Sequence, residues 1–174
     1  MIEPVLGYTA RPMAKHEPFS GTEVLDATPE EIHAFLTDLD RLVSIVPGLV
    51  KKEIGEDGIC RTTVRPGFSF IKANLKQSFE LVEHTPCNQV VIGVEAKGIG
   101  NKFGVRSTLD LAPHEEGKTL LEWEAEIVHM SGLVAAVGTT IIRAAADQVI
   151  KQGFEAMRQA IRDTPPAAES NDEN

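Results

Sequence analysis

The sequence has little basic charge, few cysteines and few aromatic side chains, and each shortage excludes a class of protein. Lys and Arg number 17 against 26 Asp and Glu, so the 174 residues carry a net charge of −9. Because phosphate backbones are bound through clustered Lys and Arg, this balance excludes a nucleic-acid partner. Two cysteines, Cys60 and Cys87, are too few for a disulfide framework, and no Cys/His spacing fits a metal. We therefore expect reduced thiols, no bound metal and no cofactor.

Long apolar runs are absent as well. Residues 1–17 contain Glu3, Arg11 and Lys15 but no apolar run of the length of a signal-peptide core. The most apolar stretch, residues 127–146, includes His129 and Arg143, which disfavours a spanning helix. The sequence therefore predicts a cytoplasmic protein. Any contact with a membrane is expected to be peripheral and at the inner face of that membrane.

The composition predicts one domain between two extensions. Apolar residues make up 42% of the chain, enough for a sizeable core. Residues 1–17 show no clean periodicity and form an N-terminal extension. Residues 164–174 begin with Thr164, Pro165 and Pro166 and continue with small and acidic residues that have nothing to bury, which predicts a disordered acidic tail. The domain itself is expected over residues 18–163.

The start of the domain predicts a strand and two short helices. Residues 19–26 alternate and are rich in Thr and Val, which is typical of a strand. Thr28 and Glu31 have the spacing of a capping box, so a helix is expected over residues 30–37. A second short helix is expected from Leu39 to the Pro47-Gly48 pair.

The middle of the chain predicts an antiparallel sheet covered by one long helix. Residues 50–130 have a period of two, broken by short turns, which predicts six further strands with one apolar and one wet face. Residues 133–162 then show a helical pattern long enough to cross the sheet. One face of that helix is expected to carry Val137, Ile141, Ala145, Val149, Gly153 and Met157.

Small residues in the middle of this helix face predict a cavity. Ala144, Ala145, Ala146 and Gly153 leave space against a curved sheet, and a ligand cavity requires roughly 300 to 1,000 Å³. The alternative is that large sheet residues fill the gap. The predicted ligand-binding residues are those expected to face this space: Ile71, Ala73, Leu75, Gln77, Phe79, Val94, Phe103, Val105, Ser107, Leu109, Trp123, Ala125, Val137, Ile141, Ala145 and Val149.

Polar groups on the expected apolar face are few. Gln77 and Ser107 lie at inward positions, where they either hold a ligand oxygen or are satisfied by each other or by water. His129 keeps step with Trp123, so it points inward at the cavity mouth or is a rim histidine bonded to backbone. Trp123 itself is one wall of a ring-binding slot or a plain core residue.

No catalytic group is predicted. None of the five histidines has the spacing of an acid/base pair or a metal site, and neither cysteine has a neighbouring histidine. Gly98-Ile99-Gly100 lacks the third glycine of a dinucleotide fingerprint and runs on into a strand, so it is a bend in the sheet.

Basic residues gather at two places in the predicted sheet. Lys72 and Lys76 share the outward face of one strand, and Lys97, Lys102 and Arg106 cluster near the next turn. This group is either a docking face for an acidic partner or anionic lipid head groups, or simply a solvated face.

The order of elements resembles the helix-grip fold of the START, Bet v 1-like or SRPBCC superfamily. In this α+β fold a seven-stranded curved antiparallel sheet wraps around a long C-terminal helix, and two short helices follow the first strand. Local sequence over residues 19–161 resembles the CoxG subunit of carbon monoxide dehydrogenase. The matching segments are Phe19-Ser20-Gly21, Leu25-Asp26-Ala27, Ile45-Val46-Pro47-Gly48, Gly55-Glu56-Asp57, Ala96-Lys97-Gly98-Ile99-Gly100, Val137-Gly138 and residues 150–157. Gln77, Leu49, Val94 and Ala96 depart from the family pattern, which implies a pocket of different shape.

The resemblance implies a non-catalytic cytosolic protein that accompanies a molybdenum hydroxylase complex. It implies a hydrophobic, quinone- or isoprenoid-like ligand and a role in bringing the enzyme to the membrane. Two other classes stay open. A helix-grip enzyme of the polyketide cyclase or aromatase type would show several inward acids, histidines or tyrosines, and an assembly chaperone would have a filled core.

Overall fold

The structure is a computed structural model that describes residues 16–68, 73–98 and 100–164. The expected N-terminal extension and acidic tail therefore lie almost wholly outside the described residues. The elements follow the chain as β1 (Phe19–Leu25), α1 (Pro29–Thr37), α2 (Leu39–Ser44), β2 (Leu49–Ile54), β3 (Cys60–Val64), β4 (Leu75–Thr85), β5 (Gln89–Gly98), β6 (Asn101–His114), β7 (Lys118–Gly132), α3 (Leu133–Ala136) and α4 (Thr139–Arg162).

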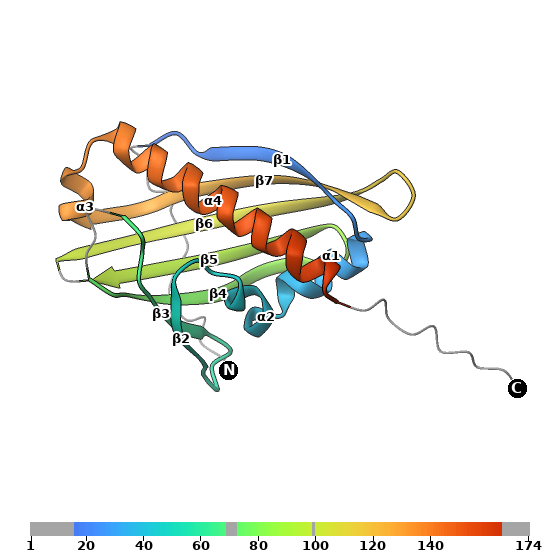
Figure 1. Cartoon of the computed structure of the whole chain (residues 1–174), viewed down its shortest axis with the longest axis horizontal. Coiled ribbons are helices and arrows are strands. Elements are labelled where there is room, and N and C mark those ends of the chain that lie inside the picture. Colours follow the sequence, from blue (N-terminus) through green and yellow to red (C-terminus); the bar gives the residue numbers. More distant parts are fainter. Residues whose placement is uncertain (1–15, 69–72, 99, 165–174) are drawn as a thin grey trace, which may run out of the picture.

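The strands form one curved antiparallel sheet in the order β1-β7-β6-β5-β4-β3-β2. Figure 1 shows α4 crossing one face of this sheet diagonally, with α1 and α2 at one end and α3 at the other. We call the face toward α4 the inner face and the opposite one the outer face. The predicted α+β fold, with seven strands, a long C-terminal helix and two short helices after the first strand, is confirmed.

The two short helices begin where side chains cap them. The Thr28 hydroxyl accepts a hydrogen bond from the Glu31 N–H at 3.3 Å, and the Glu31 carboxylate accepts one from the Thr28 N–H at 2.9 Å. This reciprocal pair is the predicted capping box, and it satisfies two N–H groups that a helix start leaves free. Asp38 caps α2 in the same way through the Arg41 N–H. Helix α2 ends at Ser44, earlier than the expected end at Pro47.

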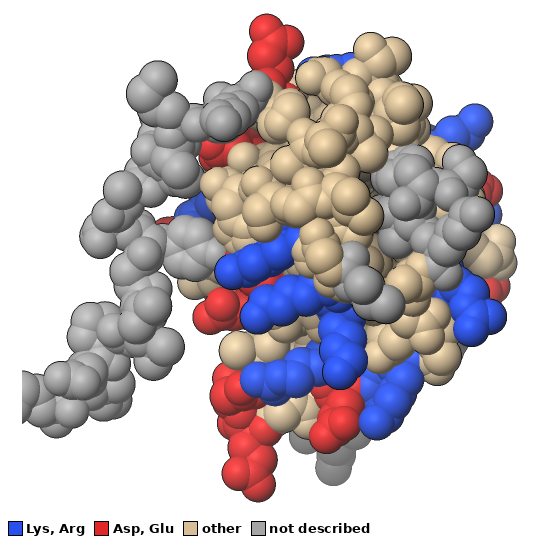
Figure 2. Space-filling model, turned by 90° about the vertical axis from the view of Figure 1, so that its left-hand side faces the viewer, with Lys and Arg blue, Asp and Glu red and all other residues tan. Residues whose placement is uncertain are grey.

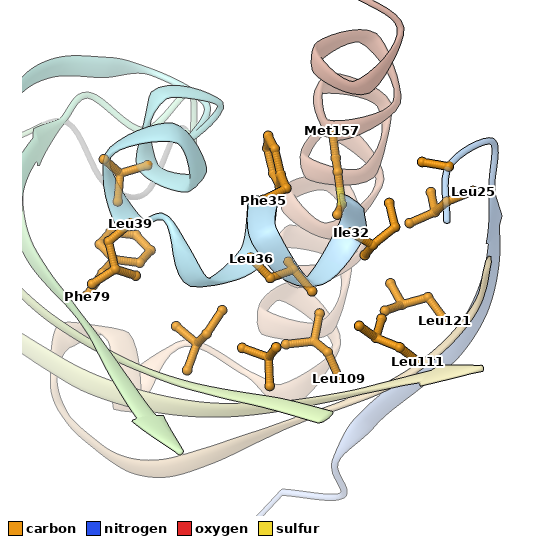
Figure 3. Packing of buried hydrophobic residues seen from close by; sticks show 14 of the residues in the cluster. Leu25, Ile32, Phe35, Leu36, Leu39, Phe79, Leu109, Leu111, Leu121 and Met157 are labelled. Atoms are coloured by element: carbon orange, nitrogen blue, oxygen red, sulfur yellow. The ribbon is translucent and has the colours of Figure 1, made fainter. Parts of the chain in front are cut away.

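The main hydrophobic core lies under α1, at one end of the inner face. Figure 3 shows Ile32 and Leu36 of α1 facing Leu109, Leu111 and Leu121 of the sheet, with Met157 of α4 beside them. Leu25, Ile32, Leu36 and Leu121 are among the largest fully buried side chains. Burial of such a side chain contributes about 1.5–3 kcal/mol. The amphipathic pattern of α1 therefore closes this end of the sheet.

A second, smaller cluster closes part of the other end. Val64 of β3, Leu75 of β4 and Val134 of α3 are buried together. Phe103 and Met130 pack against them while remaining partly exposed. The inner face thus has one packed cluster toward each end. Between them lies a stretch of half-buried side chains that borders the main core, against which Val94 and Trp123 pack.

The covering helix differs from the single helix expected over residues 133–162. Val137 is extended at φ −72°, ψ 131°, and Gly138 is extended as the N-cap of α4, so the chain forms α3 and α4 with a break between them. Glycine is a favourable N-cap residue. The expected face was also wrong at two positions. Ile141 is 51% and Val149 is 41% exposed, although Ala145 and Gly153 of the same series are half-buried and Met157 is buried.

Most of the α4 residues that are at least partly buried form a stripe along the helix. It contains Ile142, Ala145, Ala146, Ile150, Gly153, Phe154, Met157, Ala160 and Ile161, and Ala156 and Arg158 beside it are half-buried too. Met157 is buried and belongs to the main core, whereas the residues near the start of the helix keep part of their surface in water. Helix α4 is therefore packed firmly only toward its C-terminal end.

We expect Thr119→Val to destabilise the fold by about 1–3 kcal/mol, because it leaves a buried carbonyl without a partner. Thr119 is fully buried, and its hydroxyl donates a 2.7 Å hydrogen bond to the carbonyl oxygen of Ala27. Urea unfolding measures the change. Thr22→Val is the matched control on the exposed outer side of β1, and an equal loss in both variants would contradict the role of this hydrogen bond.

Candidate ligand-binding site

The candidate site is the middle of the inner face, between the two packed clusters. Strand register places Val94, Val105 and Ile127 in one row across β5, β6 and β7, and Ser107 beside Ala125 in the next. All five are half-buried, although they face the helix side of the sheet. Apolar side chains that keep solvent exposure beneath a covering helix provide a surface for an apolar ligand.

Helix α4 does not bury this part of the sheet. Ile142, Ala145 and Ala146, near its start, are themselves only half-buried. Ala145, Ala146 and Gly153 are small residues of its partly buried stripe. The predicted combination of small helix residues and a half-buried apolar sheet is therefore present in the structure.

Two cationic side chains hold α4 along the β1 edge. The Arg158 guanidinium donates a hydrogen bond to the Glu23 carboxylate in a half-buried ion pair. The Arg143 guanidinium lies 4.9 Å from the centre of the Phe19 ring, in the range of a cation–π interaction. Sequence analysis missed Glu23 as an inward residue, although its place between Gly21 and Leu25 on one side of the strand was the available signal.

Trp123 carries the unusual polar atom of the site. Its Nε1 is buried, and among the described residues no acceptor receives its hydrogen bond. The indole lies against Gly21, where a Cβ atom would come within 2.7 Å of the ring, and its centre is 5.7 Å from that of the Phe154 ring. A buried N–H without a partner costs about 1–3 kcal/mol, so this donor is one that an acceptor on a ligand would satisfy.

The two predicted inward polar residues have different surroundings. Gln77 Oε1 accepts a 3.2 Å hydrogen bond from the Thr62 hydroxyl on β3, so its partner is Thr62 and not Ser107. The Ser107 hydroxyl makes no hydrogen bond within the described part of the chain. Ser107 lies directly opposite Ala125, which makes it a diagonal neighbour of Trp123 on the same face. Two polar groups without protein partners are thus close together in an apolar surround.

The other predicted site residues fall into four groups. Leu75, Phe79 and Leu109 are buried core residues, whereas Phe103 and Val94 are half-buried on the inner face. On the helix side, Ala145 is half-buried and Val137 lies at the break before α4. Ala73 lies in a bend before β4 instead of within a strand, and Ile71 lies outside the described residues.

The inward placement of His129 was wrong. A bulge between the β6 pair Gly104 and Val105 and their β7 partners inserts Val128, and one extra residue reverses the alternation of faces. His129 therefore lies on the outer face, with Nε2 at 2.9 and 2.8 Å from the two oxygens of Glu95. Gly104 lies between them, and a Cβ atom there would come within 2.5 Å of both side chains.

Reactive chemistry is sparse in the described part of the chain. No group of three or more His, Cys, Asp or Glu residues there is placed to hold a metal ion. Cys60 is fully buried, and burial raises the pKa of its thiol, which disfavours the nucleophilic thiolate. The Arg61 guanidinium lowers the pKa of the Asp57 carboxyl to about 2 through an exposed ion pair far from the inner face.

The fold and the inner-face site define a START-like helix-grip protein. A conserved protein from Geobacillus kaustophilus has a similar structure, with a TM-score of 0.76 and 20% identity over 84% of this chain and 95% of that one. A START superfamily protein from Mycobacterium smegmatis matches with a TM-score of 0.63 and 15% identity over 83% and 97%. At these identities the likeness shows the fold alone.

The family is shown by sequence. The family model for the CoxG subunit of carbon monoxide dehydrogenase matches residues 21–162. The chain belongs to this CoxG family, which confirms the resemblance found in the sequence. No curated protein matches the sequence significantly.

Among the residues that the structure describes, no helix is both long enough and apolar enough to cross a bilayer.

We expect Gly21→Ala to destabilise the fold by about 1–3 kcal/mol, because the new methyl group collides with the rigid indole of Trp123. Urea unfolding, followed by circular dichroism, measures the loss. Gly153→Ala is the matched control: open space surrounds that position inside α4, so the same change should stabilise the helix by about 0.5–1 kcal/mol. A neutral Gly21→Ala would show that Trp123 does not rest on β1.

Proposed function

We propose that this protein binds a hydrophobic, quinone- or isoprenoid-like molecule between the inner face of the sheet and α4. It acts as a non-catalytic binding or carrier protein. The observation that carries the proposal is the half-buried apolar band between the two core clusters, with the unpartnered N–H of Trp123 at its edge. Family membership supports the same class of function.

The polar groups of the band favour a ligand with acceptor oxygens. Trp123 Nε1 is a donor only, and the Ser107 hydroxyl donates or accepts. A quinone offers two carbonyl acceptors on a flat ring, and its isoprenoid chain suits the aliphatic row of Val94, Val105 and Ile127. The tilted pair of Trp123 and Phe154 provides aromatic surface for the ring.

The inner face supplies little for acid/base catalysis, which argues against the polyketide cyclase alternative. The Glu23 carboxylate, which lies on the helix side of β1, is already paired with Arg158. Gln77 is bonded to Thr62, and His129 lies on the outer face. A general acid or base must reach the reacting group with a suitable pKa, and the residues of the apolar band offer none.

The partner enzyme that we propose is suggested by membership of the CoxG family and not by the geometry of the site. A CoxG-like protein is expected to serve a molybdenum hydroxylase and its recruitment to the cytoplasmic side of the membrane. A carrier with its ligand between sheet and helix fits that role, because it moves an apolar molecule between a bilayer and an enzyme without exposing it to water.

We expect a water-soluble ubiquinone or menaquinone analogue to quench the tryptophan fluorescence of the protein saturably. The chain has one Trp, so its emission reports one site, and a quinone beside the indole accepts energy or electrons from the excited ring. A titration at fixed protein concentration measures the effect. Linear quenching equal to that of free tryptophan, with the fold intact, would contradict quinone contact with Trp123.

The Trp123→Phe variant separates the contribution of the indole N–H to ligand binding from that of the aromatic ring. Calorimetry replaces fluorescence here, because the variant no longer carries a tryptophan. Loss of one neutral hydrogen bond of about 1 kcal/mol should weaken binding of the analogue about fivefold. Loss of the N–H should not lower the free energy of unfolding of the ligand-free protein, because Nε1 has no hydrogen-bond partner there among the described residues.

We expect Ala145→Leu to block the ligand while leaving the fold intact. The side chain is half-buried near the start of α4, which does not bury this part of the sheet, so the added atoms occupy ligand space. Ala144→Leu is the matched control on the exposed side of the helix. Calorimetry measures ligand binding and urea unfolding measures the stability of both variants. A loss of about 1–3 kcal/mol of stability in Ala145→Leu would indicate an overpacked, filled core.

A further inference from the structure

Four lysines on the outer face line up in one row across the sheet. Strand register places Lys51 opposite Thr63, Thr63 opposite Lys76, Lys76 opposite Lys97 and Lys97 opposite Lys102. We call Lys51, Lys76, Lys97 and Lys102 the lysine row. Residues directly opposite each other on neighbouring strands have Cβ atoms about 5 Å apart, so the last three ammonium groups can meet over one small anion.

The lysine row is largely without counter-charges of its own. Lys76, Lys97 and Lys102 are exposed and form no ion pair with any described residue. Lys51 is 3.7 Å from Glu53 in a solvent-exposed pair, which contributes little. Like charges directly opposite each other destabilise a sheet, and this arrangement occurs in a chain of net charge −9.

A hollow lies beside the row on the outer face. It has a volume of about 240 Å³, and its lining includes Lys51, Arg61, Lys76 and Lys97 together with Glu53 and Glu95. Arg61 is bonded to Asp57, and Glu95 to His129, so Lys76 and Lys97 are the uncommitted charges of the hollow. Figure 2 shows Lys and Arg side chains gathered on this end of the molecule, with Asp and Glu side chains among them, beside a broad uncharged surface.

We propose that the lysine row and its hollow bind a phosphate group, carried by a small soluble ester or by a lipid head group. A tetrahedral phosphate offers several oxygens to ammonium groups that arrive from adjacent strands, and lysine is a common phosphate ligand because it acts as a point charge. The hollow is on the face opposite α4, so this site is independent of the ligand proposed for the inner face.

The position of the row makes the lipid source testable. Lys102 lies opposite Ser131, two residues before Leu133, which is 68% exposed. An exposed apolar side chain close to one end of a row of lysines suits the boundary between head groups and acyl chains of an anionic bilayer. A soluble phosphate ester would need the hollow and the lysines but not Leu133.

The experiment uses the full chain with two probes at low salt. Vesicles of phosphatidylcholine with and without phosphatidylglycerol are sedimented with the protein, and glycerol 3-phosphate is titrated in a calorimeter. Binding of the anionic vesicles alone assigns the site to a lipid head group, and binding of glycerol 3-phosphate alone assigns it to a soluble ester. Absence of binding to both probes overturns the proposal.

Variants test the residues. The pair Lys76→Gln with Lys97→Gln should weaken vesicle binding about 30-fold, at about tenfold per 1.4 kcal/mol and about 1 kcal/mol for each lysine. The matched pair Lys118→Gln with Lys151→Gln removes the same charge elsewhere and should bind almost as the unaltered chain does. An equal loss in both pairs would show attraction by overall charge and overturn the site.

Two further measurements distinguish a loss of lysine charge from a loss of folding as the cause of weaker binding. The pair Lys76→Arg with Lys97→Arg keeps the charge and should keep binding, and a loss there as large as in the glutamine pair would contradict the proposal. The glutamine pair should also have a higher Tm than the unaltered chain at low salt, because the substitutions relieve like-charge repulsion. Weaker binding in a more stable protein identifies the lysines as ligands and excludes unfolding as the cause.

Discussion

The way α4 is held decides what the inner face of the sheet can do. Its C-terminal end is fixed in the main core through Met157, and its side toward β1 is fixed by Arg158 on Glu23 and Arg143 on Phe19. Toward the start of the helix the stripe consists of small or half-exposed side chains. A helix anchored at one end and along one edge leaves the side chains of the sheet near its start half-buried.

The core divides into two clusters because different helices cover the two ends of the inner face. The main cluster depends on α1, whose apolar side chains reach Leu109, Leu111 and Leu121 of the sheet. The smaller one depends on α3, which brings Val134 to Val64 and Leu75. Because both clusters lie toward the ends of the inner face, most of the stabilising burial is there. The half-buried band between them is the surface to which we propose that the ligand binds.

Much of this architecture follows from local patterns in the sequence. Period-two alternation predicted the strands, and the Thr28 and Glu31 spacing predicted the capped start of α1, because both patterns depend on residues close along the chain. The reversal at Val128 was missed, since a bulge is defined by the partner strand and not by the bulged strand itself. Glu23 was missed for a similar reason: its partner Arg158 lies 135 residues away.

The helix shows the same limit in another form. Ile141 and Val149 were expected at the sheet together with Ala145, Gly153 and Met157, but both are exposed. Apolar spacing along a helix does not tell how closely the sheet approaches each turn. Only the direction from which the sheet approaches fixes the true stripe. The candidate site was therefore predicted better on its strand side, where the faces are fixed by alternation, than on its helix side.

Alternation also separates the two faces of the sheet chemically. The strands that contribute Gln77, Val94 and Val105 to the inner face present every second residue to the outer face. Packing of the core does not determine which side chains stand there. Folding alone would favour opposite charges across neighbouring strands there. The register instead places Lys76, Lys97 and Lys102 side by side. A row of like charges that the core does not require, and that weakens the sheet, is best explained by something outside the fold.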